Sequence, residues 1–198
     1  MNLPNKISIC RILLIPIVMF FYLATFIECG KLVALLIYVV AASTDFVDGM
    51  IARRTNQVTS LGKFLDESAD KLLTTSILVM ILSEGILNNI FCVLAVFSIL
   101  ARDQIVGFLR RMAVQRKGLV VAADKLGKIK TIILDISLAL IMFLSVNNTY
   151  LWLQGTLGQV YLVFTYTVFS IGLVMNLVSG INYVYKYREC LKDEKTEN

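Results

Sequence analysis

Six long runs of apolar residues, separated by short polar breaks, dominate this sequence of 198 residues. The runs cover residues 12–27, 32–52, 64–82, 90–112, 129–146 and 160–187. About 20 mainly apolar residues are enough for a helix to cross the hydrocarbon layer of a bilayer. A single crossing segment can satisfy its backbone polar groups there only as a helix. The pattern therefore predicts an all-α integral membrane protein with six transmembrane helices.

The composition agrees with a membrane location. Hydrophobic residues make up 58% of the chain and charged residues 17%, whereas soluble domains are about half apolar and a quarter charged. Residues 2–11 mix polar and apolar side chains, which predicts a short interfacial helix before the first span. Since no linker-like stretch interrupts the chain, residues 1–187 are predicted to be one membrane domain, followed by a charged cytoplasmic tail at 188–198.

Basic residues lie mainly on one side of the predicted membrane. They precede the first span (Lys6, Arg11), follow the second (Arg53, Arg54, Lys63), cluster between the fourth and fifth (eight from Arg102 to Lys130) and end the chain (Lys186, Arg188, Lys192, Lys195), whereas the opposite loops hold Lys31 alone. Basic loops stay in the cytoplasm. We therefore predict a multi-pass protein of the cell (inner) membrane with both termini in the cytoplasm. The net charge of +5 then requires no nucleic-acid partner.

Two pairs of aspartates occupy the cytoplasmic ends of the second and third spans. Asp45 and Asp48 are three residues apart, and Asp66 and Asp70 are four apart, so each pair projects from one face of its helix. Carboxylates at membrane depth are costly and indicate function by default. A short connection makes the two helices antiparallel, which allows the pairs to converge near the cytoplasmic surface.

The residue types at this point favour a divalent metal site. The chain has no histidine, and its four cysteines are scattered. Four carboxylates are hard oxygen ligands, which suit Mg²⁺ or Mn²⁺. Gly49 and Gly62 allow close approach to the backbone, and Arg53 supplies a cation for a phosphate. Such an arrangement is typical of phosphoryl transfer.

Two other readings of the aspartates remain open at this point. Neighbouring Arg53, Arg54, Lys63 and Lys71 could neutralise them as ion pairs without a catalytic role. An ion-coupled transporter would also use membrane carboxylates, but it predicts them near mid-membrane on broken helices. Here they lie at span ends.

The same residues resemble the signature of the CDP-alcohol phosphotransferase family. Positions 45–70 read D-x-x-D-G-x-x-A-R, eight residues, then G-x-x-x-D-x-x-x-D, and all eight specified positions fit. The resemblance implies that the four aspartates hold two metal ions and that Asp70 is also the general base. It further implies a homodimer and a CDP-lipid site lined by Asn5, Ser8, Gly49, Ala52, Arg53, Thr59 and Gly62.

The cytoplasmic region after the fourth span bears on the acceptor alcohol. Its cations lie on the same side as the aspartates and would attract an anionic acceptor such as a polyol phosphate. The pattern resembles the branch of the family that makes phosphatidylglycerophosphate from CDP-diacylglycerol and sn-glycerol 3-phosphate. In that branch the acceptor phosphate would be bound by Arg102, Arg110, Lys128 and Lys130. The chain departs from the branch pattern at Glu67 and Asp135.

Other acceptors remain open within the same chemistry. They include phosphatidylglycerol, which would make the protein a cardiolipin synthase, as well as inositol phosphate and serine.

Overall fold

The computed structural model describes the backbone of residues 3–54, 60–117 and 125–187. The side chains of residues 3–5, 45–54, 60, 61, 63, 114–117 and 125 are not part of this description. The described residues form six α-helices and no strand: α1 (Leu3–Leu23), α2 (Gly30–Arg54), α3 (Ser60–Glu84), α4 (Asn89–Lys117), α5 (Lys125–Tyr150) and α6 (Gly155–Tyr187). The predicted all-α architecture is confirmed, and five of the six predicted spans lie entirely within one helix.

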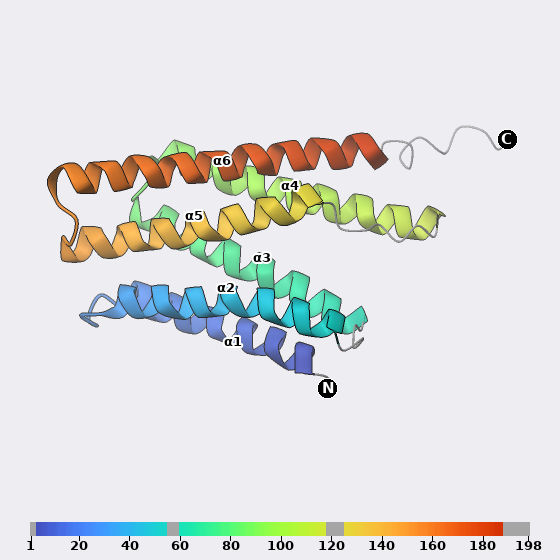
Figure 1. Ribbon diagram of the computed structural model, residues 1–198, viewed down its shortest axis with the longest axis horizontal. Coiled ribbons are helices and arrows are strands. Elements are labelled where there is room, and N and C mark those ends of the chain that lie inside the picture. The colour runs from blue at the N-terminus through green and yellow to red at the C-terminus, as the bar shows by residue number, and fades with distance from the viewer. Residues whose placement is uncertain (1–2, 55–59, 118–124, 188–198) are drawn as a thin grey trace.

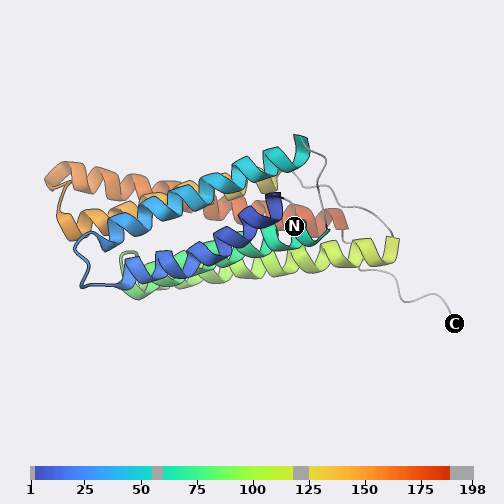
Figure 2. The ribbon, with the colours of Figure 1, turned by 90° about the horizontal axis from the view of Figure 1, so that it is seen from below.

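The helices form an elongated bundle whose members run roughly along one axis (Figure 1). Helix α1 packs against α2 and α3, α5 packs against α2, α3 and α6, and α4 packs against α3 and α6. The start of α1 and the end of α6 lie at the same end of the bundle (Figures 1 and 2). We call this the motif end, because the acidic motif at the end of α2 and the start of α3 lies there too.

Four helices are long and apolar enough to cross a membrane in the part of the chain that the structure describes. The segments are Lys6–Leu23, Asn89–Ala113, Leu126–Tyr150 and Gly155–Tyr187, and Gly30–Thr44 is a shorter apolar helix. Apolar side chains such as Phe97 and Phe164 point outwards, with exposed fractions of 71% and 53%, as expected for surfaces that contact lipid. The chain is therefore a multi-pass membrane protein. Helix α3 is not among the four, since acidic and basic side chains occupy its first turns.

Two details of the sequence prediction for the N-terminus are wrong. The predicted interfacial helix at 2–11 is not separate, since Leu3–Leu23 is one continuous helix. Its residue Arg11 is 1% exposed, so it is buried between helices. The first predicted span ran to residue 27, but α1 ends at Leu23. The chain turns back there, and Gly30 lies so close to α1 that a Cβ atom would be 2.5 Å from the carbonyl oxygen of Phe21.

A polar cluster joins four helices at the other end of the bundle. The carboxylate of Glu84, at the end of α3, accepts hydrogen bonds from Tyr22 of α1, Lys31 of α2 and Ser145 of α5. Apolar residues of the same helices, including Val18, Ile77 and Ile141, fill the core between this cluster and the motif end. The cluster therefore fixes the helix ends opposite the motif.

Candidate active site

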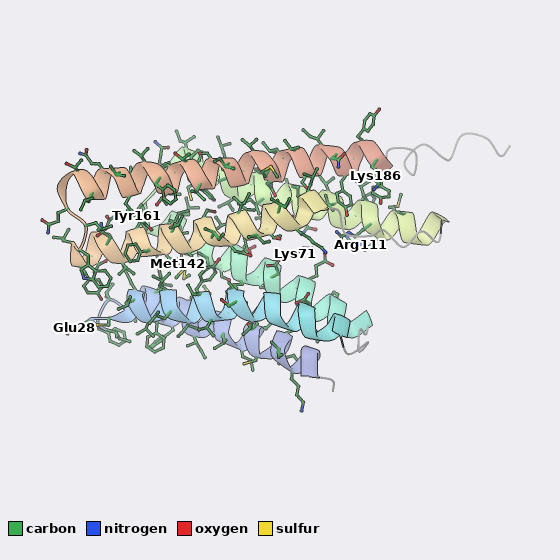
Figure 3. All side chains as sticks on the ribbon, viewed as in Figure 1. Glu28, Lys71, Arg111, Met142, Tyr161 and Lys186 are labelled. Carbon is green, nitrogen blue, oxygen red and sulfur yellow. The ribbon has the colours of Figure 1, made fainter. Side chains whose placement is uncertain are left out.

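A cavity of about 600 Å³ opens at the motif end between α3, α4, α5 and α6. Its lining includes two of the four predicted metal ligands and all four predicted acceptor-phosphate ligands: Asp66, Asp70, Arg102, Arg110, Lys128 and Lys130. Figure 3 labels Lys71, another lining residue, in the half of the bundle nearer the motif end. The acidic wall comes from α3, and the basic wall comes from α4 and α5.

The acidic wall is built on the first turns of α3. Asp66 and Asp70 are one helical turn apart, which places both on the cavity side. The Asp66 side chain is 50% exposed and accepts a hydrogen bond of 3.2 Å from Nη1 of Arg11. That arginine extends from α1 and is 1% exposed. A buried cation beside a carboxylate lowers the cost of keeping both charged.

The remaining predicted motif residues are only partly described. Asp45, Asp48, Gly49, Ala52 and Arg53 lie in the last turns of α2, and Asn5 lies in the first turn of α1. Their side chains are outside the description. Thr59 lies outside the described residues altogether. Ser8 is 3% exposed on α1, and Gly62 is in the first turn of α3.

The described donors suit a hard divalent cation. Two carboxylates of α3 face a cavity that is open to solvent, and oxygen donors of this kind favour Mg²⁺ or Mn²⁺. Among the side chains that the structure describes, no three Asp, Glu, Cys or His residues come together. The predicted site needs Asp45 and Asp48 from α2 as well, and these two are not in that set. The end of α2 and the start of α3 lie near each other (Figure 1).

The basic wall is organised around one acidic residue that the sequence analysis did not single out. The Oδ1 atom of Asp103 on α4 accepts hydrogen bonds from Arg102 at 2.8 Å and from Lys130 of α5 at 2.9 Å. Lys130 is only 3% exposed. Asp103 therefore ties α4 to α5 and holds two cations beside each other.

Arg110 lies about two helical turns further along α4. Its Nη2 atom donates to the hydroxyl oxygen of Tyr183 on α6 at 3.2 Å, and its guanidinium carbon lies 5.6 Å from the centre of that ring. Lys128, two residues before Lys130 on α5, is exposed and lines the same cavity. The cavity thus offers cations at different depths.

Lys71 has a local partner. Its Nζ atom lies 2.7 Å from Oε1 of Glu67, four residues earlier on α3. The alternative in which Lys71 neutralises the motif aspartates is therefore not supported by this contact. The pair also gives Glu67, a departure from the branch pattern, a surface role on α3.

A smaller cavity of about 160 Å³ lies beside the larger one, between α3, α4 and α5. It shares Asp70, Asp103 and Lys130 with the larger cavity and adds polar side chains from three helices, among them Thr75, Gln104 and Asp135. The space beside Asp70 is therefore polar, and it is large enough for a few water molecules or a small polyol.

Sequence reasoning missed four residues that shape the site: Arg11, Asp103, Ser179 and Tyr183. Arg11 was read as a topology determinant because it precedes the first apolar run. Asp103 carried a signal, as an acidic residue inside a basic cluster. Ser179 and Tyr183 lie in an apolar run without a motif, and only their four-residue spacing hinted at a shared helix face.

Comparison with known proteins gives a consistent result. A sequence model of the CDP-alcohol phosphatidyltransferase family matches residues 1–176. The chain is 34% identical to the CDP-diacylglycerol–glycerol-3-phosphate 3-phosphatidyltransferase of Rickettsia felis, over 96% of each chain. It is 31% identical to the protein of that name from Escherichia coli K12, over 98% of each chain. It is also 40% identical to the Bacillus subtilis protein of that name, over 66% of this chain and 70% of the other.

Proposed function

Because this chain belongs to the CDP-alcohol phosphatidyltransferase family, we propose that it transfers the phosphatidyl group of CDP-diacylglycerol to sn-glycerol 3-phosphate. The products are phosphatidylglycerophosphate and CMP, and the reaction belongs to phospholipid biosynthesis. Relatives similar over nearly the whole chain carry the name of this activity. The observation that carries the proposal is the single cavity in which Asp70 faces the cations of α4 and α5.

The cations bind the acceptor through its phosphate. Arg102, Arg110, Lys128 and Lys130 line the cavity opposite the acidic wall. Guanidinium and ammonium groups form charge-assisted hydrogen bonds with phosphate oxygens. A phosphate held there leaves the hydroxyl end of a three-carbon acceptor free to reach α3. A neutral acceptor would gain little from this wall, which favours glycerol 3-phosphate over serine.

Asp70 accepts the proton from the acceptor hydroxyl. The acceptor oxygen then forms a bond to the lipid-side (β) phosphorus of CDP-diacylglycerol. The bond from that phosphorus to the bridging oxygen breaks, and CMP leaves with the electron pair. Because no side chain has to act as a nucleophile, a single displacement suffices.

The motif residues bind the donor and its metal ions. Asp45, Asp48, Asp66 and Asp70 would hold Mg²⁺ or Mn²⁺, which neutralises phosphate oxygens and developing charge in reactions of this class. The CDP moiety would be bound by Asn5, Ser8, Gly49, Ala52, Arg53, Thr59 and Gly62.

The motif end faces the cytoplasm in this proposal, and the protein lies in the cell (inner) membrane as a homodimer. Basic residues gather at that end on α4 and α5, which favours the cytoplasmic side. The CDP head group of the donor and the acceptor glycerol 3-phosphate are both charged and hydrophilic, so both approach the site from an aqueous side of the membrane. Residues 1–187 form the catalytic domain, and 188–198 form a cytoplasmic tail.

An acceptor panel tests the proposal. Purified protein in detergent is given CDP-diacylglycerol, Mg²⁺ or Mn²⁺, and one of five acceptors: glycerol 3-phosphate, phosphatidylglycerol, inositol phosphate, serine or glycerol. We expect CMP release with glycerol 3-phosphate well above the others. A preference for phosphatidylglycerol or inositol phosphate would overturn the acceptor assignment. No CMP release with any acceptor would overturn the proposed chemistry and favour a transporter.

A further inference from the structure

Helix α6 carries none of the signature residues, yet one of its faces is polar and buried. Asn176, Ser179 and Tyr183 are 0%, 1% and 3% exposed, and Gly180 is buried among them. Their spacing of three and four residues places them on one side of the helix. Polar side chains buried between membrane helices are costly unless they have partners. The partners of this face lie on α4.

The first partner is Arg102. Its Nη2 atom donates to the hydroxyl oxygen of Ser179 at 2.8 Å. A Cβ atom added to Gly180 would lie 2.9 Å from Cγ of Arg102, so the stem of the arginine rests directly on the backbone of α6. Ser179 therefore holds the guanidinium end and Gly180 holds the stem.

The second partner is Arg110, which contacts Tyr183 in two ways. Its guanidinium donates to the tyrosine hydroxyl at 3.2 Å and lies 5.6 Å from the ring centre. The ring packs against the guanidinium group and the hydroxyl oxygen accepts a hydrogen bond from it. Together these two contacts restrict the position and the tilt of the guanidinium group. The contacts of α6 thus reach both arginines that line the cavity.

Both arginines keep hydrogen-bonding capacity for an anion. The Nε atoms of Arg102 and Arg110 are buried and have no hydrogen-bond partner among the described residues. A buried donor without a partner costs free energy until a ligand or water supplies an acceptor. An oxygen-rich anion bound in the cavity would offer acceptors to the two arginines that line it.

We infer that α6 is the positioning helix of the acceptor-phosphate site: Ser179, Gly180 and Tyr183 fix where the two guanidinium groups stand, and thereby set the affinity for a phosphorylated acceptor. This inference rests on the proposed function. The three residues act through the arginines, so they are positioning residues. Their loss weakens acceptor binding and leaves donor binding and the chemical step in place.

Steady-state kinetics of Ser179→Ala, Gly180→Ala and Tyr183→Phe test the inference. Ser179→Ala and Tyr183→Phe each remove one hydrogen bond, and Tyr183→Phe keeps the ring. Gly180→Ala instead adds a methyl group 2.9 Å from Cγ of Arg102, which displaces the arginine. We expect KM for glycerol 3-phosphate to rise about tenfold, the size of one hydrogen bond to a charged group. KM for CDP-diacylglycerol and kcat stay within about twofold. The inhibition constant of inorganic phosphate rises in parallel, because phosphate uses the same cations.

Two matched variants serve as controls. Ser179→Thr keeps the hydroxyl and should recover most of the increase in KM that Ser179→Ala causes. Tyr185→Phe loses a hydroxyl from the same helix at a side chain that is 65% exposed, and it should also behave as wild type. An unchanged KM for glycerol 3-phosphate in both Ser179→Ala and Tyr183→Phe overturns the inference. Equal losses towards both substrates, or an unchanged phosphate inhibition constant, overturn it as well.

The two proposals fail separately. Wild-type protein that does not use glycerol 3-phosphate refutes the proposed function, whatever the variants do. Wild-type protein that uses it, with α6 variants that bind it equally well, refutes only the positioning role of α6.

Discussion

Asp103→Asn is the substitution whose effect follows most directly from the structure. The carboxylate lies 2.9 Å from Lys130 and 2.8 Å from Arg102, and Lys130 is 3% exposed. At an effective dielectric constant near 20, a pair at 2.9 Å attracts by about 6 kcal/mol before desolvation is counted. Removing one partner of a buried pair typically costs about 3–5 kcal/mol. Because Asp103 is one-fifth exposed, we expect about 3 kcal/mol, or a fall in Tm of roughly 6–12 °C.

Thermal unfolding of purified protein in detergent, followed by circular dichroism, measures this effect. Glu67→Gln is the matched control, since Glu67 forms an exposed pair with Lys71 at 2.7 Å that is worth about 0.5 kcal/mol or less. The double variant Asp103→Asn/Lys130→Met removes the most buried cation together with its carboxylate partner and should recover most of the lost Tm. If Asp103→Asn lowers Tm no more than Glu67→Gln does, the buried basic wall is not held as we describe.

Four further predictions concern the motif, the acceptor, the metal and the far end of the bundle. Asp70→Asn should abolish CMP release and leave CDP-lipid binding largely intact in an equilibrium binding assay; full turnover would refute its role as base. Lys128→Ala should mainly raise KM for glycerol 3-phosphate, several-fold for an exposed cation, and an unchanged KM would argue for another acceptor. Chelation with EDTA should stop turnover, and Mg²⁺ or Mn²⁺ should restore it without a change in helical content. Glu84 lies beyond the predicted span 64–82. Burial of this carboxyl group raises its pKa, but hydrogen bonds from Lys31, Tyr22 and Ser145 outweigh burial, and the pKa is lowered below the ordinary 4.5. A carboxyl group with a lowered pKa stabilises the fold at pH values above its ordinary pKa, and this stabilisation is lost as the pH falls through the folded-state pKa. The Tm difference between wild type and Glu84→Gln should therefore be constant near neutral pH and shrink below about pH 4.5. A Tm difference that grows in acid would contradict this.

Hydropathy predicted the helices well because the bilayer imposes a minimum length on each apolar run. It predicted their ends less well. Nothing in the composition of residues 24–27 separates them from the apolar run before them, and the helix ends where Gly30 lets the chain turn back onto Phe21. The separate N-terminal helix was expected because residues 2–11 mix polar and apolar side chains, among them Arg11. The burial of Arg11 depends on the contact with Asp66 across two helices, which no local pattern reveals.

The acidic half of the site was predictable because its residues are close in sequence. Helical periodicity alone brings Asp66 and Asp70 to one face. The basic half depends on tertiary contacts between α4, α5 and α6. Arg102 and Lys130 were expected near the cavity, but the carboxylate that joins them and the α6 residues that hold the arginines come from packing. An apolar run reveals little about which of its few polar residues meet another helix.

Transfer of label from radiolabelled glycerol 3-phosphate into lipid tests the central claim most directly. Wild-type protein with CDP-diacylglycerol and Mg²⁺ or Mn²⁺ should move the label into a chloroform-soluble product and release one CMP for each label transferred. A protein that leaves all label in the aqueous phase at every level of either metal would contradict the account.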